Sequence, residues 1–454
     1  MKKRITLSLA SLLACAAVPA LTACPNNRGN VITFWHTMGQ DKQVLVDRII
    51  KQFNEIYPDI VIEHSAQGDY NGLHEKLKSA IPAGTMPTMA FCYPDHVADY
   101  LSSKAVINVE DYLARDDTKF TAEDGALEDY VQSYWREGQT YQQNGTYSVP
   151  FAKSTEVMFY NKTFFDKYAD YISVPTTWDE MWETCRIIKE RIIPGDPNDD
   201  KLNGESGIEF PMGYDSDANL FITLCEQRGI PYISNENITK KEDHILFNNS
   251  DAKALITDLV AKEREGLFAT KNCLANNAYT STYFTEEKTV MSIGSTGGTS
   301  YQTSSNFEVA VAQAPVTSTT NGGNKLISQG PSICFFKKGS DQVKDGAWKF
   351  YKFLTRAFNT AAYATMSGYE PVRKSAKDLP EYQTYLAGTS LQAKVSKVTS
   401  TITEDRFIYS PVFVGSAKAR EEVGTILSLV YSNLKSLDDA FAQAYSATVN
   451  ATQK

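Results

Sequence analysis

Residues 31–35 read VITFW, and this short run of β-branched and aromatic residues predicts a strand. Apolar residues then recur at spacings of three and four, which predicts an amphipathic helix, until Pro58 ends the pattern. Residues 60–62, IVI, begin a second β-rich run. A strand, a helix and a strand form the unit from which parallel sheets are built, so this stretch predicts an α/β fold.

The same alternation continues outward along the chain. A helix is expected from Tyr70 to Ile81 and a third strand over 88–93. After residue 147 the pattern begins again, with a strand over 157–160, a helix over 177–191 and a strand over 290–293. We therefore expect a bilobed protein, with two α/β lobes around a hinged cleft that is the default ligand site.

The prediction assigns each lobe two separate parts of the sequence. The expected ranges are 31–148 plus 329–367 for the N-terminal lobe, 149–314 plus 370–454 for the C-terminal lobe, and 315–328 for a crossing segment. Further crossings are expected near 147–151 and 368–371. One long helix over 340–365 and two final helices over 417–433 and 437–449 complete the expected elements.

Composition and charge exclude several classes of protein. The chain has 454 residues, of which 42% are hydrophobic and 22% charged, so it is neither disordered nor too short for two domains. Its formal net charge is −9, and its basic residues are scattered rather than clustered. This balance argues against a nucleic-acid-binding protein.

The first 23 residues are expected to be an export signal. Three basic residues, at positions 2–4, precede a nearly uncharged apolar run that ends in small residues before Cys24. This ending resembles the bacterial lipoprotein signal, in which the cysteine carries lipid; the alternative is an ordinary signal peptide followed by a chance cysteine. Residues 24–30 are expected to form a tether, and no later stretch is long and apolar enough to span a membrane.

The sequence offers little for metal or covalent chemistry. No histidine pair has metal-ligand spacing, the five cysteines after Cys24 form no C-x-x-C pair, and we expect no metal and no cofactor. The loop 196–205, DPNDDKLNGE, resembles a calcium loop but lacks its glycine and its final acid, so a solvated acidic loop is favoured. The turn 294–298, GSTGG, can expose a hydroxyl and backbone N–H groups, although a plain turn fits equally well.

Several motifs, spread in order over the chain, resemble one family. They are ITFWHTMG at 32–39, VPF at 149–151, TTWDE at 176–180 and SGYEPV at 367–372. Together they resemble extracellular solute-binding proteins of ABC importers, in the carbohydrate group that includes maltose-binding and glycerol-3-phosphate-binding proteins.

The resemblance implies a set of ligand-binding residues by position. The matched positions are Tyr70, Ser154, Ser295, Gly330, Tyr369 and Arg420. Hydroxyls, a backbone N–H and one guanidinium suit a phosphate or other anionic oxygens. Where the sequence departs from the glycerol-3-phosphate branch, Asp95 and Asp215 stand near the two binding loops, so the polyol-facing half differs. His36 follows the first strand and is expected to reach the cleft.

The expected function is therefore binding without chemistry. A lipid-anchored monomer in the cell envelope would capture a sugar, polyol or phosphate ester and deliver it to ABC permease subunits in the inner membrane. An exported carbohydrate-active hydrolase, with Asp95 and Asp215 as a carboxylate pair, is an alternative. A lipoprotein adhesin or scaffold is another alternative and would need an exposed interaction surface.

Overall fold

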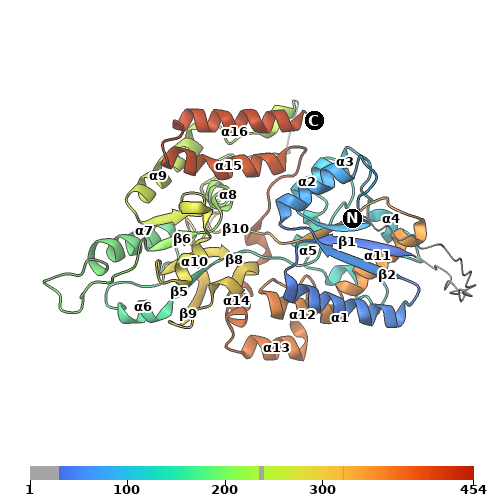
Figure 1. Ribbon diagram of the computed structural model, residues 1–454, viewed down its shortest axis with the longest axis horizontal. Coiled ribbons are helices and arrows are strands. Elements are labelled where there is room, and N and C mark those ends of the chain that lie inside the picture. The colour runs from blue at the N-terminus through green and yellow to red at the C-terminus, as the bar shows by residue number, and fades with distance from the viewer. Residues whose placement is uncertain (1–29, 235–239, 321, 454) are drawn as a thin grey trace, which may run out of the picture.

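The computed structural model describes residues 30–234, 240–320 and 322–453, which form two α/β bodies side by side (Figure 1). The sheet of the first body has the strand order β2-β1-β3-β11-β4, and that of the second body has the order β7-β6-β8-β5-β9. This arrangement confirms the predicted bilobed α/β fold. The leader, Cys24 and residues 25–29 of the predicted tether lie outside the described residues.

The first body begins with the strand, helix and strand that the sequence predicts. Its elements are β1 (Val31–His36), α1 (Gln40–Ile56), β2 (Val61–Ala66), α2 (Tyr70–Ala80), β3 (Met89–Cys92), α3 (Pro94–Leu101), α4 (Glu110–Leu113), α5 (Gln132–Glu137), β4 (Val149–Pro150), β11 (Ser332–Phe335), α11 (Asp341–Leu354) and α12 (Ala357–Ser367). Strands β1, β2 and β3 are parallel, whereas β11 enters from the other body and is antiparallel to both β3 and β4.

The second body is built in the same manner from later parts of the chain. Its elements are β5 (Glu156–Asn161), α6 (Lys162–Lys167), α7 (Trp178–Ile187), β6 (Met212–Tyr214), α8 (Asp217–Arg228), α9 (Ser250–Arg264), β7 (Phe268–Thr270), α10 (Thr280–Thr285), β8 (Met291–Ser295), the 3-10 helix η5 (Thr296–Gln302), β9 (Val309–Gln313), α14 (Leu391–Thr399), α15 (Ser416–Tyr431) and α16 (Leu437–Thr452). Helix α13 (Pro380–Ala387) and the short paired strands β10 (Leu326–Ile327) and β12 (Phe407–Ile408) complete the α-helices and β-strands of the described residues.

Each body has its own apolar core, which explains why the patterns repeat along the sequence. In the first body the buried side chains of β1 and α1, such as Phe34 and Phe53, pack with those of β3, β11 and α11. In the second body α7, α8, α9 and α15 cover the sheet around Met158 and Met212. Burial of such side chains stabilises each fold by about 1.5–3 kcal/mol per residue.

The outgoing crossing lies later in the chain than the predicted 147–151, and the returning one is shorter than the predicted 315–328. The chain passes from β4 to β5 over 151–155 and returns from β10 to β11 over 328–331. Val316, Leu326 and Ile327 are buried in the second core, so 315–328 belongs to the second body and the crossing follows it. The predicted start of the C-terminal lobe at 370 is also early, because Val372 is buried in the first core. The other limits of the two lobes remain a prediction.

The single helix predicted over 340–365 is wrong, because the chain breaks at Thr355–Arg356 between α11 and α12. Arg356 has an extended backbone and its guanidinium donates to Asp124, while the carbonyl of Thr355 accepts from the buried Arg373. These tertiary contacts favour two helices over one. The apolar spacing in the sequence fits one helix or two equally well, so it does not show the break.

Among the described residues, no helix has the length and apolar composition needed to cross a membrane. Within the same residues Cys92, Cys185, Cys225, Cys273 and Cys334 are unpaired, and all but Cys273 are buried.

Candidate functional site

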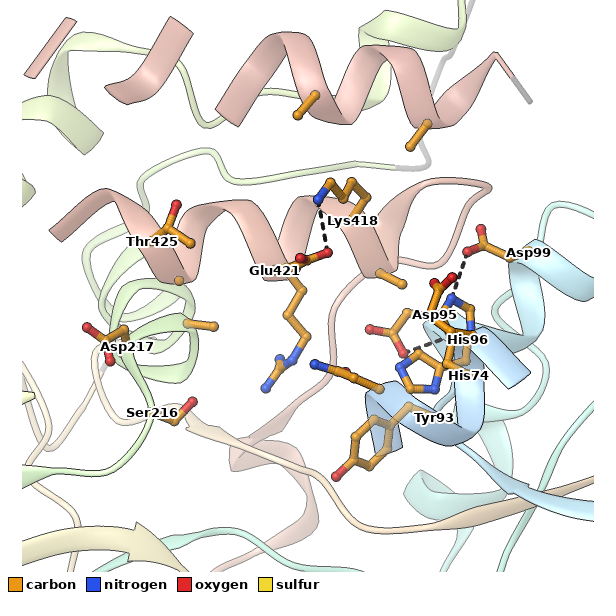
Figure 2. Close-up of a pocket in the computed structure, with 18 of the residues that line it drawn as sticks. His74, Tyr93, Asp95, His96, Asp99, Ser216, Asp217, Lys418, Glu421 and Thr425 are labelled. Carbon is orange, nitrogen blue, oxygen red and sulfur yellow. Dashed lines mark hydrogen bonds and ion pairs between the residues drawn. The ribbon is translucent and has the colours of Figure 1, made fainter. Parts of the chain in front are cut away.

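A cleft with a volume of about 870 Å³ lies between the two bodies. On one side it is lined by α2, α3 and Tyr93, and on the other by α8, α15, α16 and the turns after β6 and β7. In Figure 2, Tyr93, Asp95 and His96 lie across from Ser216 and Asp217, while α15 runs along the cleft with Lys418, Glu421 and Thr425. Both bodies therefore supply polar groups to one space, as expected of a ligand site.

The carboxyl end of β3 supplies the aromatic part of the cleft. Tyr93 follows that strand directly, as the residue before α3, and its ring stacks on Tyr70 with centroids 4.3 Å apart. Burial raises the pKa of both phenols, so both remain neutral hydrogen-bonding groups. A pair of tyrosines offers an apolar face with polar edges, which is suited to a sugar ring or a polyol chain.

Asp95 and Arg420 bring opposite charges to the cleft from the two bodies. Asp95 lies in the first turn of α3 and is 9% exposed, and one carboxylate oxygen accepts the backbone N–H of His96 at 3.0 Å. Burial raises the pKa of Asp95, while the nearby positive charge of Arg420 opposes that rise. Arg420, in α15, donates a hydrogen bond to the side-chain oxygen of Asn219.

A smaller cavity of about 40 Å³ extends this region toward the crossing segments. It shares Tyr93, Asp95 and Arg420 with the cleft and adds Glu137 and Gln329. The candidate site therefore reaches the place where the chain passes between the bodies.

Asp215 and Ser295 lie at the carboxyl ends of the neighbouring strands β6 and β8 of the second sheet. One carboxylate oxygen of Asp215 accepts both the backbone N–H and the hydroxyl of Thr280, each at 2.7 Å. Burial raises the pKa of Asp215, and the hydrogen bonds from Thr280 oppose that rise. The hydroxyl of Ser295 accepts the N–H of Gly297 at 3.2 Å, so it begins η5 rather than facing solvent freely.

Tyr369 explains the glycine-rich turn after β8. A Cβ atom on Gly297 would lie 2.5 Å from the ring of Tyr369, so only glycine allows this approach between the turn and the tyrosine. The pKa of Tyr369 is raised by burial, while a hydrogen bond with Tyr70 opposes that rise. The structure thus brings the two predicted tyrosines together.

Ser154 and Gly330 lie in the two crossings themselves. Ser154 and Gln329 exchange backbone hydrogen bonds of 2.9 and 2.7 Å, which join the outgoing and returning chains. Gly330 has φ = +101°, in the left-handed region that favours glycine. Both residues therefore shape the hinge, and in the structure Ser154 is only 4% exposed.

The structure does not bring His36 to the cleft. His36 is fully buried in the first body, and its two ring nitrogens bond to His64 at 2.8 Å and to the backbone N–H of Met38 at 3.1 Å. Burial and, to a smaller extent, the neighbouring His64 lower its pKa to about 4, while Asp47 opposes the shift. No atom of the ring is left for a ligand, so this prediction is wrong.

The loop 196–205 directs its acidic groups to protein donors. The carboxylate of Asp199 accepts the hydroxyl of Tyr171 at 2.5 Å, and that of Glu205 accepts both Lys167 and Tyr168 at 2.6 Å. Within residues 30–234, 240–320 and 322–453, no group of three or more His, Cys, Asp or Glu side chains is arranged to hold a metal ion.

Sequence reasoning missed the residues that surround Arg420. These are Glu156, Asn219 and Gln329, together with the cleft residue Tyr93. Tyr93 had a usable signal, because ligands gather at the carboxyl ends of strands. The other three come together only in the fold, and no spacing in the sequence predicts their contact.

The chain is similar in sequence and fold to several known proteins. The family model described as bacterial extracellular solute-binding protein matches residues 48–389. The sn-glycerol-3-phosphate-binding periplasmic protein UgpB of Shigella flexneri serotype 5b is 25% identical over 359 residues, which cover 78% of this chain and 76% of that protein.

Solved structures show the same fold at low identity. UgpB from Mycobacterium tuberculosis, in complex with glycerophosphocholine, is 19% identical with a TM-score of 0.71, over 93% of this chain and 98% of that one. The ABC substrate-binding protein Lmo0181 from Listeria monocytogenes, in complex with cycloalternan, is 17% identical with a TM-score of 0.72, over 94% and 99%. With the family model spanning most of its length, the chain belongs to the bacterial extracellular solute-binding protein family.

Proposed function

We propose that this protein is the solute-binding component of an ABC importer and captures a sugar, polyol or phosphate ester between its two bodies. The observation that carries the proposal is the cleft of about 870 Å³, to which both bodies contribute polar side chains. The relatives named above are binding proteins rather than enzymes, so capture is favoured over hydrolysis or a scaffold role.

The chemistry of the cleft suits a ligand with two different ends. Tyr70 and Tyr93 provide a stacked aromatic surface for carbon–hydrogen faces, and Arg420 provides a cation for anionic oxygens. Ser154, Asp95, Asp215, Ser295, Gly330 and Tyr369 are proposed to complete or shape the site.

Delivery of the solute requires partners outside this chain. We propose that the monomer docks on ABC permease subunits of the inner membrane and is held in the cell envelope by lipid on Cys24. The leader 1–23 and the tether 24–30 support this part of the proposal, through their match to a lipoprotein signal.

A thermal-shift screen of the mature protein tests the proposal. Sugars, polyols and phosphate esters are added singly, because a ligand at 100 times its Kd stabilises the native state by about 2.7 kcal/mol. At least one of these solutes should raise the Tm in a saturable manner. If none of them does, the proposed function is wrong for these chemical classes.

A further inference from the structure

Asn219 lies in the first turn of α8 and is 3% exposed, yet its amide takes part in four side-chain hydrogen bonds. The oxygen accepts from Arg420 and from Gln329, the latter at 3.2 Å. The nitrogen donates to Glu156 at 2.6 Å and to Gln329 at 2.8 Å. Because every lone pair and proton of the amide is used, its orientation is fixed.

Asn219 and its three partners come from different parts of the fold. Glu156 begins β5, Asn219 lies in the first turn of α8, Arg420 lies in α15, and Gln329 lies in the crossing that leads to β11. Gln329 is itself joined through its backbone to Ser154 in the other crossing. Asn219 therefore links the cationic side chain of the cleft to the hinge.

The charge of the partner matters as much as its position. A carboxylate in the place of Asn219 would form an ion pair with Arg420 and compete with an anionic ligand for the guanidinium. The amide orients the guanidinium by a hydrogen bond and adds no charge. Within the described residues Arg420 forms no ion pair, and its bond to Asn219 leaves other N–H groups of the guanidinium to bind a ligand.

We propose that Asn219 is a positioning residue that holds the guanidinium of Arg420 in the cleft without neutralising it, so that the site selects an anionic solute. This inference rests on the proposed function and makes its ligand class more specific.

Glu156 supports this role through its contact with Asn219. One carboxylate oxygen accepts the hydroxyl of Tyr214 and the other accepts the amide N–H of Asn219, so Glu156 helps to orient Asn219. Burial raises the pKa of Glu156 to about 7, and the positive charge of Arg420 opposes this rise, so the two charges interact. Glu156 thus supplies a nearby negative charge, whereas Asn219 supplies the direct hydrogen bond to Arg420.

A purely structural role for Asn219 makes a different prediction. If Asn219 only stabilised the start of α8, substitutions there would lower stability and weaken all ligands alike. A positioning role instead predicts an effect that depends on the charge of the ligand.

The test moves one negative charge from position 156 to position 219, where it contacts Arg420. In the double variant Asn219→Asp/Glu156→Gln the new glutamine amide donates to the new aspartate and the net charge is kept, while a carboxylate now contacts Arg420. The hydrogen bond that the amide of Asn219 donates to Gln329 is lost, because a carboxylate only accepts. The single variant Glu156→Gln removes the carboxylate and leaves the contact with Asn219 possible. Calorimetry at pH 8, where Glu156 is mostly ionised, measures the affinities for sn-glycerol 3-phosphate, glycerophosphocholine and the neutral sugar maltotriose.

A matched control exists elsewhere in the second body. Arg406 donates to the amide oxygen of Gln313 at 2.8 Å, away from the cleft. Gln313→Glu makes the same change from an amide to a carboxylate beside an arginine, and it should leave every affinity unchanged.

The wild type is expected to bind at least one of the phosphate-containing solutes. The double variant should bind that solute about tenfold or more weakly than the wild type, because an ion pair now competes for the guanidinium. Glu156→Gln should bind the same solute several-fold more tightly. Equal affinities in the wild type and the folded double variant, or no gain with Glu156→Gln, would overturn the inference while the proposed function stands. Wild-type binding of maltotriose alone would also overturn it. If the wild type binds none of the three probes, the inference fails for phosphate-containing solutes, while the thermal-shift screen decides on the proposed function.

Discussion

At the scale of single residues, the cleft brings together polar groups that would form hydrogen bonds with water if they were exposed. Tyr93 and Asp95 come from the first body and Arg420 from the second, and all three line the same space. Burial disfavours the charged form of each acid, so the pKa of Asp95 rises despite the nearby guanidinium. Such a site gains most from a ligand that supplies the missing hydrogen bonds and charge.

Arg420→Ala should weaken binding without unfolding the protein. For an anionic solute we expect a loss of about 2–5 kcal/mol, because the ligand's charge is left buried without its partner. For a neutral sugar we expect about 1–3 kcal/mol from lost hydrogen bonds. Calorimetry with the solute identified in the screen measures the difference.

Arg264→Ala is the matched control for Arg420→Ala. The guanidinium of Arg264 bonds to the carbonyls of Val430 and Tyr431 near the opposite end of α15, away from the cleft. Its loss should change stability slightly and leave affinity alone. If Arg420→Ala behaves in the same way, Arg420 is not part of the binding site.

His36 should make stability depend on pH in the mildly acidic range. Its pKa falls from 6.5 in the unfolded chain to about 4 in the folded one, mainly because of burial. Between these values the unfolded chain binds a proton that the folded chain does not, so stability present above pH 6.5 is lost as the pH falls toward 4, by about 3 kcal/mol.

Urea unfolding of the wild type and of His36→Gln between pH 7 and 4.5 measures this contribution. The variant should lose less stability over that range than the wild type does. An identical pH dependence in the two proteins would show that His36 does not titrate as described.

Single residues could be predicted from the sequence only where position in a motif carries the information. Tyr70, Tyr369 and Arg420 were predicted in this manner, and their part in binding stays a prediction. Arg420 lines the cleft, Tyr70 stacks on the cleft residue Tyr93, and Tyr369 lies against the turn at Gly297. His36 was misplaced, because its alternation along β1 decides its burial and the sequence does not say which face of the strand is covered. Asn219 carried no signal, since its role depends on partners brought together by the fold.

At the scale of elements, the crossings decide how the two bodies are joined. The outgoing crossing over 151–155 and the returning one over 328–331 are bonded to each other through Ser154 and Gln329. The apolar runs of strands and helices were predictable, because burial on one face sets their period. Where the chain crosses was not, since a polar stretch such as 315–328 fits a surface loop of one body equally well.

Gly330→Ala should destabilise the protein at the returning crossing. The backbone at Gly330 has φ = +101°, and a Cβ atom there would collide with the carbonyl oxygen of Ala152 in the neighbouring crossing. Strain and collision together should cost about 2 kcal/mol or more in the free energy of unfolding, measured in urea.

Gly298→Ala is the control for this substitution. Gly298 lies in η5 and a Cβ atom there meets open space, so stability should change by no more than about 0.5 kcal/mol. A Gly330→Ala variant as stable as Gly298→Ala would mean that the crossings yield easily and are not closely packed.

At the scale of the whole molecule, two bodies with separate cores are joined by short crossings around one cleft. Such an arrangement lets the bodies rotate as rigid units while the strain falls on a few hinge residues. A solute that contacts both bodies then favours the closed arrangement, because it binds that arrangement more tightly.

The proposed lipid anchor at Cys24 has a test of its own. Wild-type protein made in a bacterial host should enter the detergent phase on phase separation, whereas Cys24→Ala should stay in the aqueous phase and still bind solute. Wild-type protein found in the aqueous phase would contradict acylation at Cys24 and favour an ordinary signal peptide.

Small-angle X-ray scattering with and without a saturating solute tests the central claim most directly, namely that the solute is captured between the two bodies. The solute is the one identified in the screen, and calorimetry first establishes that it is saturating. We predict a smaller radius of gyration in the presence of the solute, as the bodies close on it. Identical scattering curves for the free and the fully bound protein would contradict capture by closure.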